Sequence, residues 1–142
     1  MIRSGGYLYL AFPNGAGWQA RWFGPAWFHL DPPRHLAFVP PQVLVRALSD
    51  LGFELVCESH LNWEQNLYGW LQSALNLLPG KRDLLYECLK NNRSYIADTP
   101  LLVRLLHSVI AGALFIPSIG LELLAALFRR GATVEFVFRK HR

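Results

Sequence analysis

The chain has 142 residues, of which 52% are hydrophobic and only 17% are charged. This balance excludes a disordered protein, and the length suits one domain. The net charge is +4, and much of the excess lies near the end, at Arg129, Arg130, Arg139, Lys140 and Arg142. Without a distributed basic face, nucleic-acid binding is disfavoured. Two interpretations of the basic end stay open: a solvated terminus, or a contact with an anionic membrane surface.

The two cysteines, Cys57 and Cys88, are too few for a disulfide framework, and their spacing matches no metal site. A reducing, cytoplasmic compartment is therefore expected, with peripheral contact to the inner face of the membrane as the further option. Cys57 lies in a strand-like run and is predicted to be in the core. The opening "MIRSGGYLYLAF" does not have the pattern of a signal peptide, because its apolar run is too short.

The first predicted element is a strand over residues 7–12, which is apolar on both faces. Such a run is typical of a strand in the middle of a mostly parallel sheet, which needs neighbours on both sides. An irregular connection of 28 residues follows, from Pro13 to Pro40, in which Trp18 and Trp22 are spaced for one face of a short helix. It leaves the carboxyl end of the strand, where open α/β sheets bind ligands.

The clearest predicted helix is "PPQVLVRALSDLGF", with Pro41 in its first turn and Gly52 just past its end. "FELVCESHL" then alternates between apolar and polar residues and predicts a second strand. Strand, crossover with a helix and strand together form half of a parallel α/β unit.

Residues 62–130 are predicted to be helical and mostly apolar, apart from a polar break at "KNNRSYIADTP". Within residues 101–128 the formal charges are Arg104 and Glu122, and Pro117 and Gly120 interrupt the apolar run between them. The run is slightly short for a transmembrane helix, which needs about 20 apolar residues. We expect two helices that bend near Pro117. They form a buried core hairpin, lie in a membrane interface or, as a third alternative, span the membrane. A last strand, "GATVEFVFRK", closes the chain.

The order of these motifs resembles the C-terminal half of class I S-adenosylmethionine-dependent methyltransferases. "GGYLYLAFPN", an aromatic loop ending "HLDPPRHL" and a proline-led helix ending "LGF" are similar to the ubiquinone-biosynthesis-like core with a D-x-P-R-H segment, here Asp31, Pro33, Arg34 and His35. The resemblance implies a Rossmann-like α/β sheet of which this chain supplies three strands, at residues 7–12, 53–60 and 132–140. The last of them is expected to run antiparallel between the other two, after a large helical insertion.

The resemblance also implies one incomplete domain. Residues 1–61 form its strand, loop, helix and strand, residues 62–130 the apolar insertion, and residues 131–142 the final strand and basic tail. The 142 residues contain no G-x-G-x-x-G turn of the kind that holds a nucleotide cofactor. We therefore expect the acceptor-side half of a methyltransferase that uses S-adenosylmethionine. Alone it would be inactive, with a complementing N-terminal half or a homo-oligomer as partner.

The loop residues are the candidates for chemistry. His35 is the predicted general base, Asp31 would orient it, and Arg34 would bind an anionic part of the acceptor. Other acceptor contacts are predicted from the aromatic and imidazole side chains of the same segment: Trp27, Phe28, His29 and Phe38. The alternative is structural: Asp31 and Arg34 form a salt bridge that locks the loop, and His35 caps the helix or bonds a backbone carbonyl.

The resemblance places Pro13 and Asn14 beside the cofactor. Trp63, Tyr68 and Trp70 are expected to pack in the core or an interface, with lipid or acceptor contact as the alternative. The second hypothesis for function is a non-catalytic module that docks on a membrane or partner through its apolar helices and basic end. In either case, an unpaired apolar edge along the first strand predicts self-association.

Overall fold

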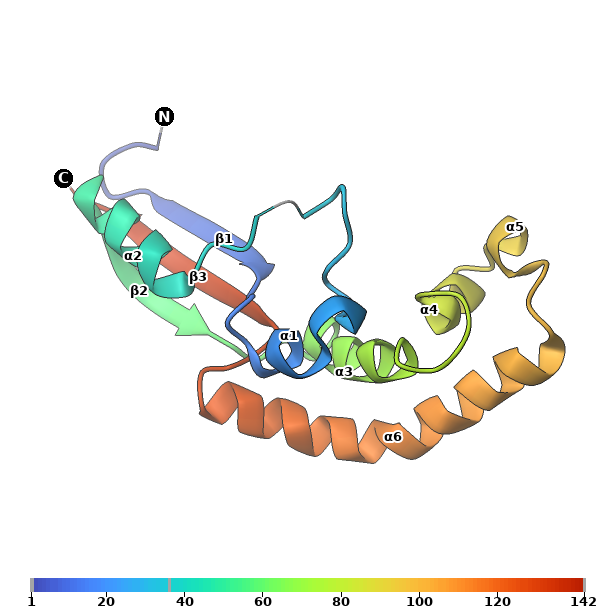
Figure 1. The fold of residues 1–142 in the computed structure, drawn as a ribbon. Coiled ribbons are helices and arrows are strands. Elements are labelled where there is room, and N and C mark those ends of the chain that lie inside the picture. The colour runs from blue at the N-terminus through green and yellow to red at the C-terminus, as the bar shows by residue number, and fades with distance from the viewer. Residues whose placement is uncertain (1, 36, 142) are drawn as a thin grey trace.

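The computed structural model describes residues 2–35 and 37–141. Figure 1 shows a small sheet at one end of the molecule and a group of helices at the other. The elements, in chain order, are β1 (Tyr7–Pro13), α1 (Trp18–Phe23), a 3-10 turn (Gly24–Ala26), α2 (Pro41–Asp50), β2 (Phe53–Ser59), α3 (Gln65–Leu75), α4 (Leu84–Leu89), α5 (Arg93–Ile96), α6 (Leu101–Leu127) and β3 (Thr133–Lys140).

The three strands form one sheet in the order β1-β3-β2. Strand β3 is antiparallel to both neighbours, with Leu10 opposite Phe136 and Leu55 opposite Phe138. Strands β1 and β2 are therefore parallel to each other and are connected through α2. The predicted α/β arrangement of three strands, with the last one antiparallel and central, is confirmed.

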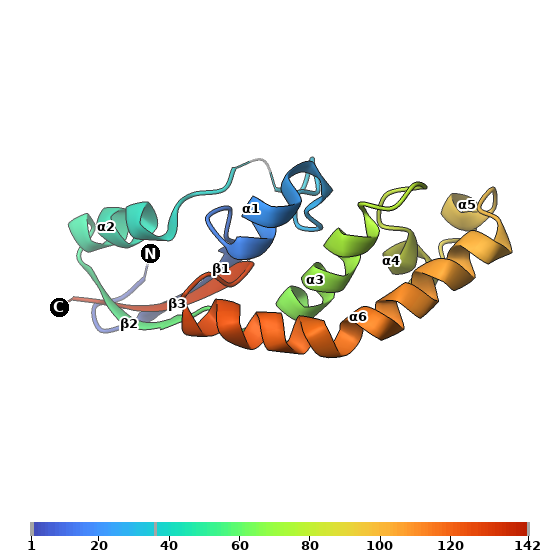
Figure 2. The same cartoon turned by 60° about the horizontal axis from the view of Figure 1, so that its bottom comes forward.

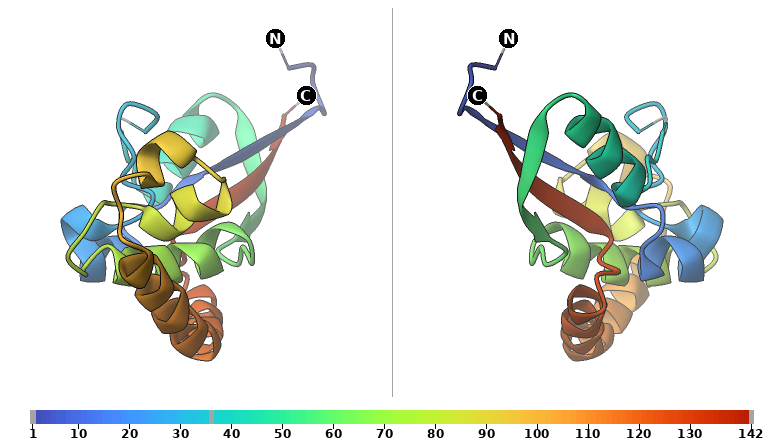
Figure 3. Two further views of the ribbon diagram at one scale, coloured as in Figure 1. Left: turned by 90° about the vertical axis from the view of Figure 1, so that its right-hand side faces the viewer. Right: turned by 90° about the vertical axis from the view of Figure 1, so that its left-hand side faces the viewer.

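One face of the sheet carries the hydrophobic core. Val134, Phe136 and Phe138 of β3 are fully buried. Phe53 of β2 is 9% exposed and belongs to the same cluster, against which Leu44 and Leu48 of α2 pack. Figure 3 shows that α2 lies over this face of the sheet and not over the other. The helix begins at Pro41 and is followed by Gly52 at a φ of 79°, so both predicted helix ends are confirmed.

The opposite face of the sheet is open. Tyr7 and Tyr9 of β1 are 63% and 60% exposed. An irregularity in pairing between Leu55 and Cys57 places Cys57 opposite Val137, the partner of Tyr9, so that Cys57 shares the open face. Its predicted core position is wrong, and the thiol is exposed. Among the described residues β3 is the neighbour of β1, and the other edge of β1 is free, which agrees with the predicted unpaired edge of the first strand.

The insertion forms four helices, of which α6 is much the longest. The predicted break at Pro117 is wrong, because α6 runs as one helix through this residue. Pro117 is exposed, so the interrupted backbone hydrogen bond lies on the outer side, where the helix curves without ending. Figure 2 shows α3 and α4 lying along the inner side of α6, which both helices contact. Among the described residues, α6 alone is long and apolar enough to cross a membrane, and 17% of its most apolar stretch is buried.

Candidate functional site

The aromatic loop lies against the insertion helices beyond the carboxyl end of β1. A cavity of about 450 Å³ separates the two, and we call it the loop groove. Its walls come from the loop, from the start of α3 and from α4: Phe28, His29, Asp31, Arg34, His35, Glu64, Gln65, Tyr68, Tyr86, Leu89 and Lys90. A smaller cavity of about 180 Å³ shares His29, His35 and Gln65 and reaches Pro13 at the end of β1.

Side chains of the insertion hold the loop in place. Arg82 donates from its guanidinium to the carbonyl oxygens of Trp27 (2.6 Å) and Leu30 (2.9 Å), and also to that of Pro25. The backbone N–H of Phe28 donates to Ser73 Oγ at 2.9 Å. The loop is therefore fixed by hydrogen bonds from residues more than 40 positions away.

Asp31 connects the two charged partners that follow it. Its Oδ1 lies 2.5 Å from Nδ1 of His35, and its Oδ2 lies 3.3 Å from Nη1 of Arg34. The orienting contact to His35 and the loop salt bridge, which were alternatives at the sequence level, thus occur together. With Nδ1 donating to the carboxylate, Nε2 of a neutral His35 carries the lone pair. The imidazole is about one-third exposed, so a bound molecule in the groove can reach it.

His29 is a different kind of histidine. It is 6% exposed, and burial lowers its pKa to about 4, so the ring is neutral at pH 7. Within the described residues, its Nε2 and Oε1 of Gln19 have no hydrogen-bond partner. Both atoms point at Gly69 of α3, where an added Cβ would lie 2.9 Å from His29 Nε2. His29 thus lies buried between the two cavities and lines both of them.

Three aromatic rings form the floor of the groove. Phe28 packs edge-on against Tyr68 and Tyr86, with ring centroids 5.2 and 5.3 Å apart. The Tyr68 hydroxyl donates to Gln72 Oε1 at 3.0 Å, and burial raises the pKa of this phenol. Lys90 Nζ stands 4.5 Å from the centre of the Tyr86 ring, which places a cation at the rim.

Trp27 and Phe38 do not join this group. Their rings pack on each other with centroids 5.3 Å apart and line a separate shallow cavity near Gly15 and Leu30. Trp27 also packs against His29 from behind, with ring centroids 5.6 Å apart. These two residues support the loop, while Phe28, His29, Asp31, Arg34 and His35 face the loop groove.

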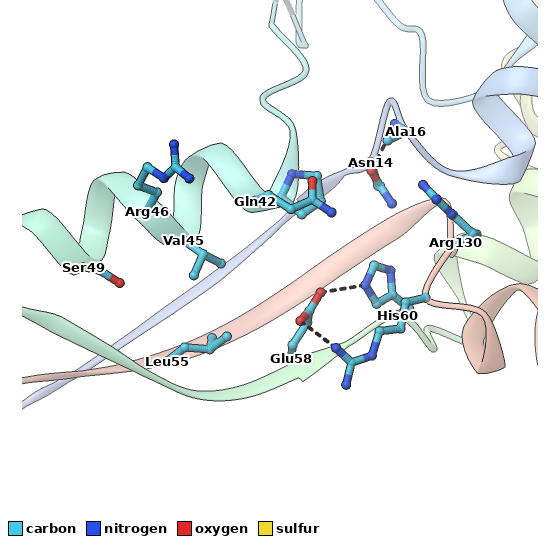
Figure 4. Close-up of a pocket in the computed structure, with 12 residues that line it drawn as sticks. Asn14, Ala16, Gln42, Val45, Arg46, Ser49, Leu55, Glu58, His60 and Arg130 are labelled. Atoms are coloured by element: carbon cyan, nitrogen blue, oxygen red, sulfur yellow. Dashed lines mark hydrogen bonds and ion pairs between the residues drawn. The ribbon is translucent and has the colours of Figure 1, made fainter.

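Pro13 and Asn14, the two residues predicted to lie beside the cofactor, line two different cavities. Pro13 lines the smaller cavity, whereas Asn14 lines a recess of about 470 Å³ on the α2 side of the sheet. Figure 4 shows this recess, in which Glu58 accepts a hydrogen bond from His60 Nε2 at 2.9 Å. The Asn14 amide is engaged at both ends, since Nδ2 donates to Gly131 O and Oδ1 accepts from Ala16 N–H.

A buried asparagine ties the groove to the sheet. Asn66, directly after the groove residue Gln65, donates from Nδ2 to Glu122 Oε1 of α6 (2.8 Å) and to His60 O (3.0 Å). Its Oδ1 accepts from both the backbone N–H and the hydroxyl of Thr133, at 2.8 and 2.7 Å. The start of α3 is thereby fixed to α6 and to β3.

Sequence reasoning missed the half of the groove that comes from the insertion. Gln65, Tyr86 and Lys90 lie in segments of unremarkable composition, and nothing in the sequence showed that α4 folds back against the loop. Tyr68 was singled out, with packing as its first role. A signal for Tyr86 and Lys90 was their spacing of four, which puts both on one helical face.

Comparison with known proteins gives no relative. No protein-family model, curated protein or solved structure was found to match the chain. Among the residues that the structure describes, no three His, Cys, Asp or Glu side chains are grouped to hold a metal ion.

Proposed function

We propose that this chain is the acceptor-side part of an S-adenosylmethionine-dependent methyltransferase with a Rossmann-like sheet. The observation that supports it best is the order β1-β3-β2, in which an antiparallel last strand separates two parallel strands. The family resemblance implies the same strand order. The aromatic loop also lies where open α/β sheets place their ligands, beyond the carboxyl end of β1.

The cofactor would be held mainly by strands outside these 142 residues. The next strand of such a sheet would pair with the free edge of β1. The further part of the domain would also bury Tyr7 and Tyr9, which are exposed on the open face. The described residues do not fit the cofactor alone, because the Asn14 amide is occupied and Pro13 offers only its ring and carbonyl. We therefore assign no step of the reaction to cofactor contacts in this chain.

The groove suits the acceptor. Nε2 of His35 would remove the proton of the accepting atom, and Asp31 would stabilise the imidazolium that forms. Phe28, Tyr68 and Tyr86 offer ring faces and edges to a planar molecule. Arg34 and Lys90 at the rim would attract an anionic substituent. We propose an aromatic acceptor with an acidic group.

The test is to reconstitute the missing part. The chain is co-expressed with any polypeptide from a neighbouring reading frame that is found to carry a glycine-rich strand-turn-helix unit. Binding of radiolabelled S-adenosylmethionine is then measured by equilibrium dialysis for the chain alone and for the complex. We expect binding by the complex and none by the chain alone. Binding by the isolated chain would show that its cofactor site is complete and would overturn the proposal.

Substitutions at two histidines distinguish the loss of the general base from a general effect on folding. His35→Gln should lower methyl transfer by the complex to a hydroxyaryl carboxylate by about 100-fold or more, with cofactor binding unchanged. His141→Gln is the matched control, since His141 follows β3 at the end of the sheet remote from the groove. Equal rates for both variants would exclude His35 as the base.

A further inference from the structure

Helix α6 has the reverse of the residue distribution that is expected for a helix in water. Its packed side carries polar groups, since His107, Ser118 and Glu122 are buried. Its outer side carries large apolar residues at a spacing of eleven, at Leu105, Ile116 and Leu127, which are 53%, 71% and 75% exposed. Further exposed apolar side chains on the helix are Leu101, Leu102, Leu106, Val109, Phe115, Leu123 and Leu124. Soluble helices show the opposite pattern.

The two charged side chains of α6 do not interrupt this outer surface. Glu122 is fully buried, and Nε of Arg104 is shielded from solvent. The exposed apolar residues form a strip along a helix of 27 residues, about 40 Å long. An ordinary protein surface carries apolar residues that are scattered singly. A continuous apolar strip of this length marks a contact with a protein or a membrane.

The helix does not have the surroundings of a membrane span. Its inner side is contacted along its length by α3 and α4, and the segments around α4 carry charged residues such as Lys81, Arg82, Asp83 and Glu87. A spanning α6 would carry these charges into the hydrocarbon, where each costs about 3 kcal/mol. A helix that lies in the plane of the membrane, with its outer side down, leaves them in water.

The shape and ends of the strip favour lipid over a second protein. Figures 1 and 2 show that α6 bulges outward, so the same convex face of a second copy would touch it over a short length only. The exposed outer residues are almost all aliphatic, without the arginines, tyrosines and hydrogen-bonding rim of protein interfaces. A lipid surface needs none of these.

An aromatic and basic anchor lies at the carboxyl end of α6. The half-exposed Phe128 packs on Trp18, and Trp18 stacks on the exposed Trp22, with centroids 5.5 and 5.9 Å apart. Arg129 follows directly; its side chain is 77% exposed, and its Nη1 lies 3.6 Å from Oε2 of Glu58 in β2. Indoles and arginines beside an apolar surface are typical of the headgroup level of a bilayer.

We propose that the outer side of α6 docks on a lipid bilayer, with the helix parallel to the membrane plane and Trp22 and Arg129 at the headgroups. The inference does not depend on methyl transfer, because it uses no residue of the loop groove. Anionic lipid would add an attraction to Arg129, and apolar insertion would supply most of the affinity.

The test is flotation of the full chain with vesicles of phosphatidylcholine, with and without phosphatidylserine. We expect flotation with both, stronger with phosphatidylserine. Leu105→Glu with Ile116→Glu should lower the bound fraction at least tenfold, since both side chains point away from the fold. Leu51→Glu with Leu77→Glu is the matched control, as both residues are exposed and lie outside α6. It should float like the wild type.

Three outcomes would overturn the proposal. The wild-type chain could fail to float, the control pair could lose flotation as strongly as the α6 pair, or the α6 pair could float normally. In the first case, sedimentation without lipid identifies what covers the strip instead. A defined oligomer that the α6 pair dissociates, together with no flotation of the wild type, would assign the strip to a second copy. Circular dichroism of each variant confirms that the fold is retained.

Discussion

At the scale of single residues, His29 gives the fold a dependence on pH. In the folded chain its pKa is lowered to about 4 by burial, while an unfolded histidine has a pKa near 6.5. Between these values the unfolded state binds more protons, so the stabilising contribution is complete above pH 6.5 and is lost as the pH falls toward 4. Thermal unfolding at pH 7.5 and pH 4.5 should show this loss, on the order of 3 kcal/mol from this group.

The substitution His29→Gln isolates the effect. The variant should lose less stability than the wild type between the two pH values, because it has no proton to take up on unfolding. His141→Gln serves as the matched control, because it makes the same substitution at an exposed position. Parallel profiles for wild type and His29→Gln would show that His29 does not titrate on unfolding.

A substitution at Gly69 tests the tight contact between α3 and the loop. An alanine methyl would collide with Gln19 Oε1 and lie 2.9 Å from His29 Nε2, both in fully packed surroundings. We expect Gly69→Ala to lower the free energy of unfolding by about 1 to 3 kcal/mol in urea titration. Gly120→Ala in α6 is the control, because open space surrounds that position and alanine favours a helix by about 1 kcal/mol. Equal effects would contradict the contact.

What the sequence could predict of the site follows from distance along the chain. Asp31 and His35 are four residues apart, and Arg34 is three from Asp31, so local geometry was enough to bring them together. Tyr86 and Lys90 reach the same groove through the folding of α4 against the loop, which no local pattern encodes. Trp27 and Phe38 share the loop with His35, yet their rings line another cavity, and no local sequence pattern distinguishes the two groups.

At the scale of elements, Glu122 shows how α6 is attached. The carboxylate lies buried at the start of α3 and accepts a hydrogen bond from Asn66 Nδ2 at 2.8 Å, and burial raises its pKa. Because the folded chain holds the proton more tightly than the unfolded chain, stability falls as the pH rises above the unfolded pKa. Glu122→Gln keeps an acceptor for Asn66 and removes the charge.

We therefore expect Glu122→Gln to raise the melting temperature at pH 8 more than at pH 5. Glu122→Leu should lower it at both, because Asn66 would lose an acceptor in a buried position. Differential scanning calorimetry at the two pH values measures both effects. A gain from Glu122→Gln that is the same at pH 5 and pH 8 would show that Glu122 is ionised throughout this range.

The elements themselves were more predictable than their surroundings. Alternation and helix-end signals gave the strands and α2 nearly to the residue, since backbone preferences act locally. The pattern of α6 was misleading because an apolar helix suits a core and a membrane equally, and Pro117 suits a break and an exposed curve equally. Both choices depend on which side of the helix the rest of the chain covers.

At the scale of the whole molecule, two apolar surfaces lack a partner among the described residues: the outer side of α6, and the edge and open face of β1. Both would drive association in water, one by burial of side chains and the other by strand pairing. They lie on separate parts of the fold, as Figure 1 shows, so substitutions can remove them independently.

The last prediction uses this separation. In the Leu105→Glu, Ile116→Glu background, sedimentation velocity should still show association that grows with concentration, because the β1 edge remains. Adding Tyr9→Lys places a charge on the exposed side of that edge strand and should shift the chain toward monomer. Val43→Lys, at an exposed position of α2, should not. If the background variant is already a monomer, the free edge does not pair in water, and the proposal that β1 awaits further strands loses its main physical support.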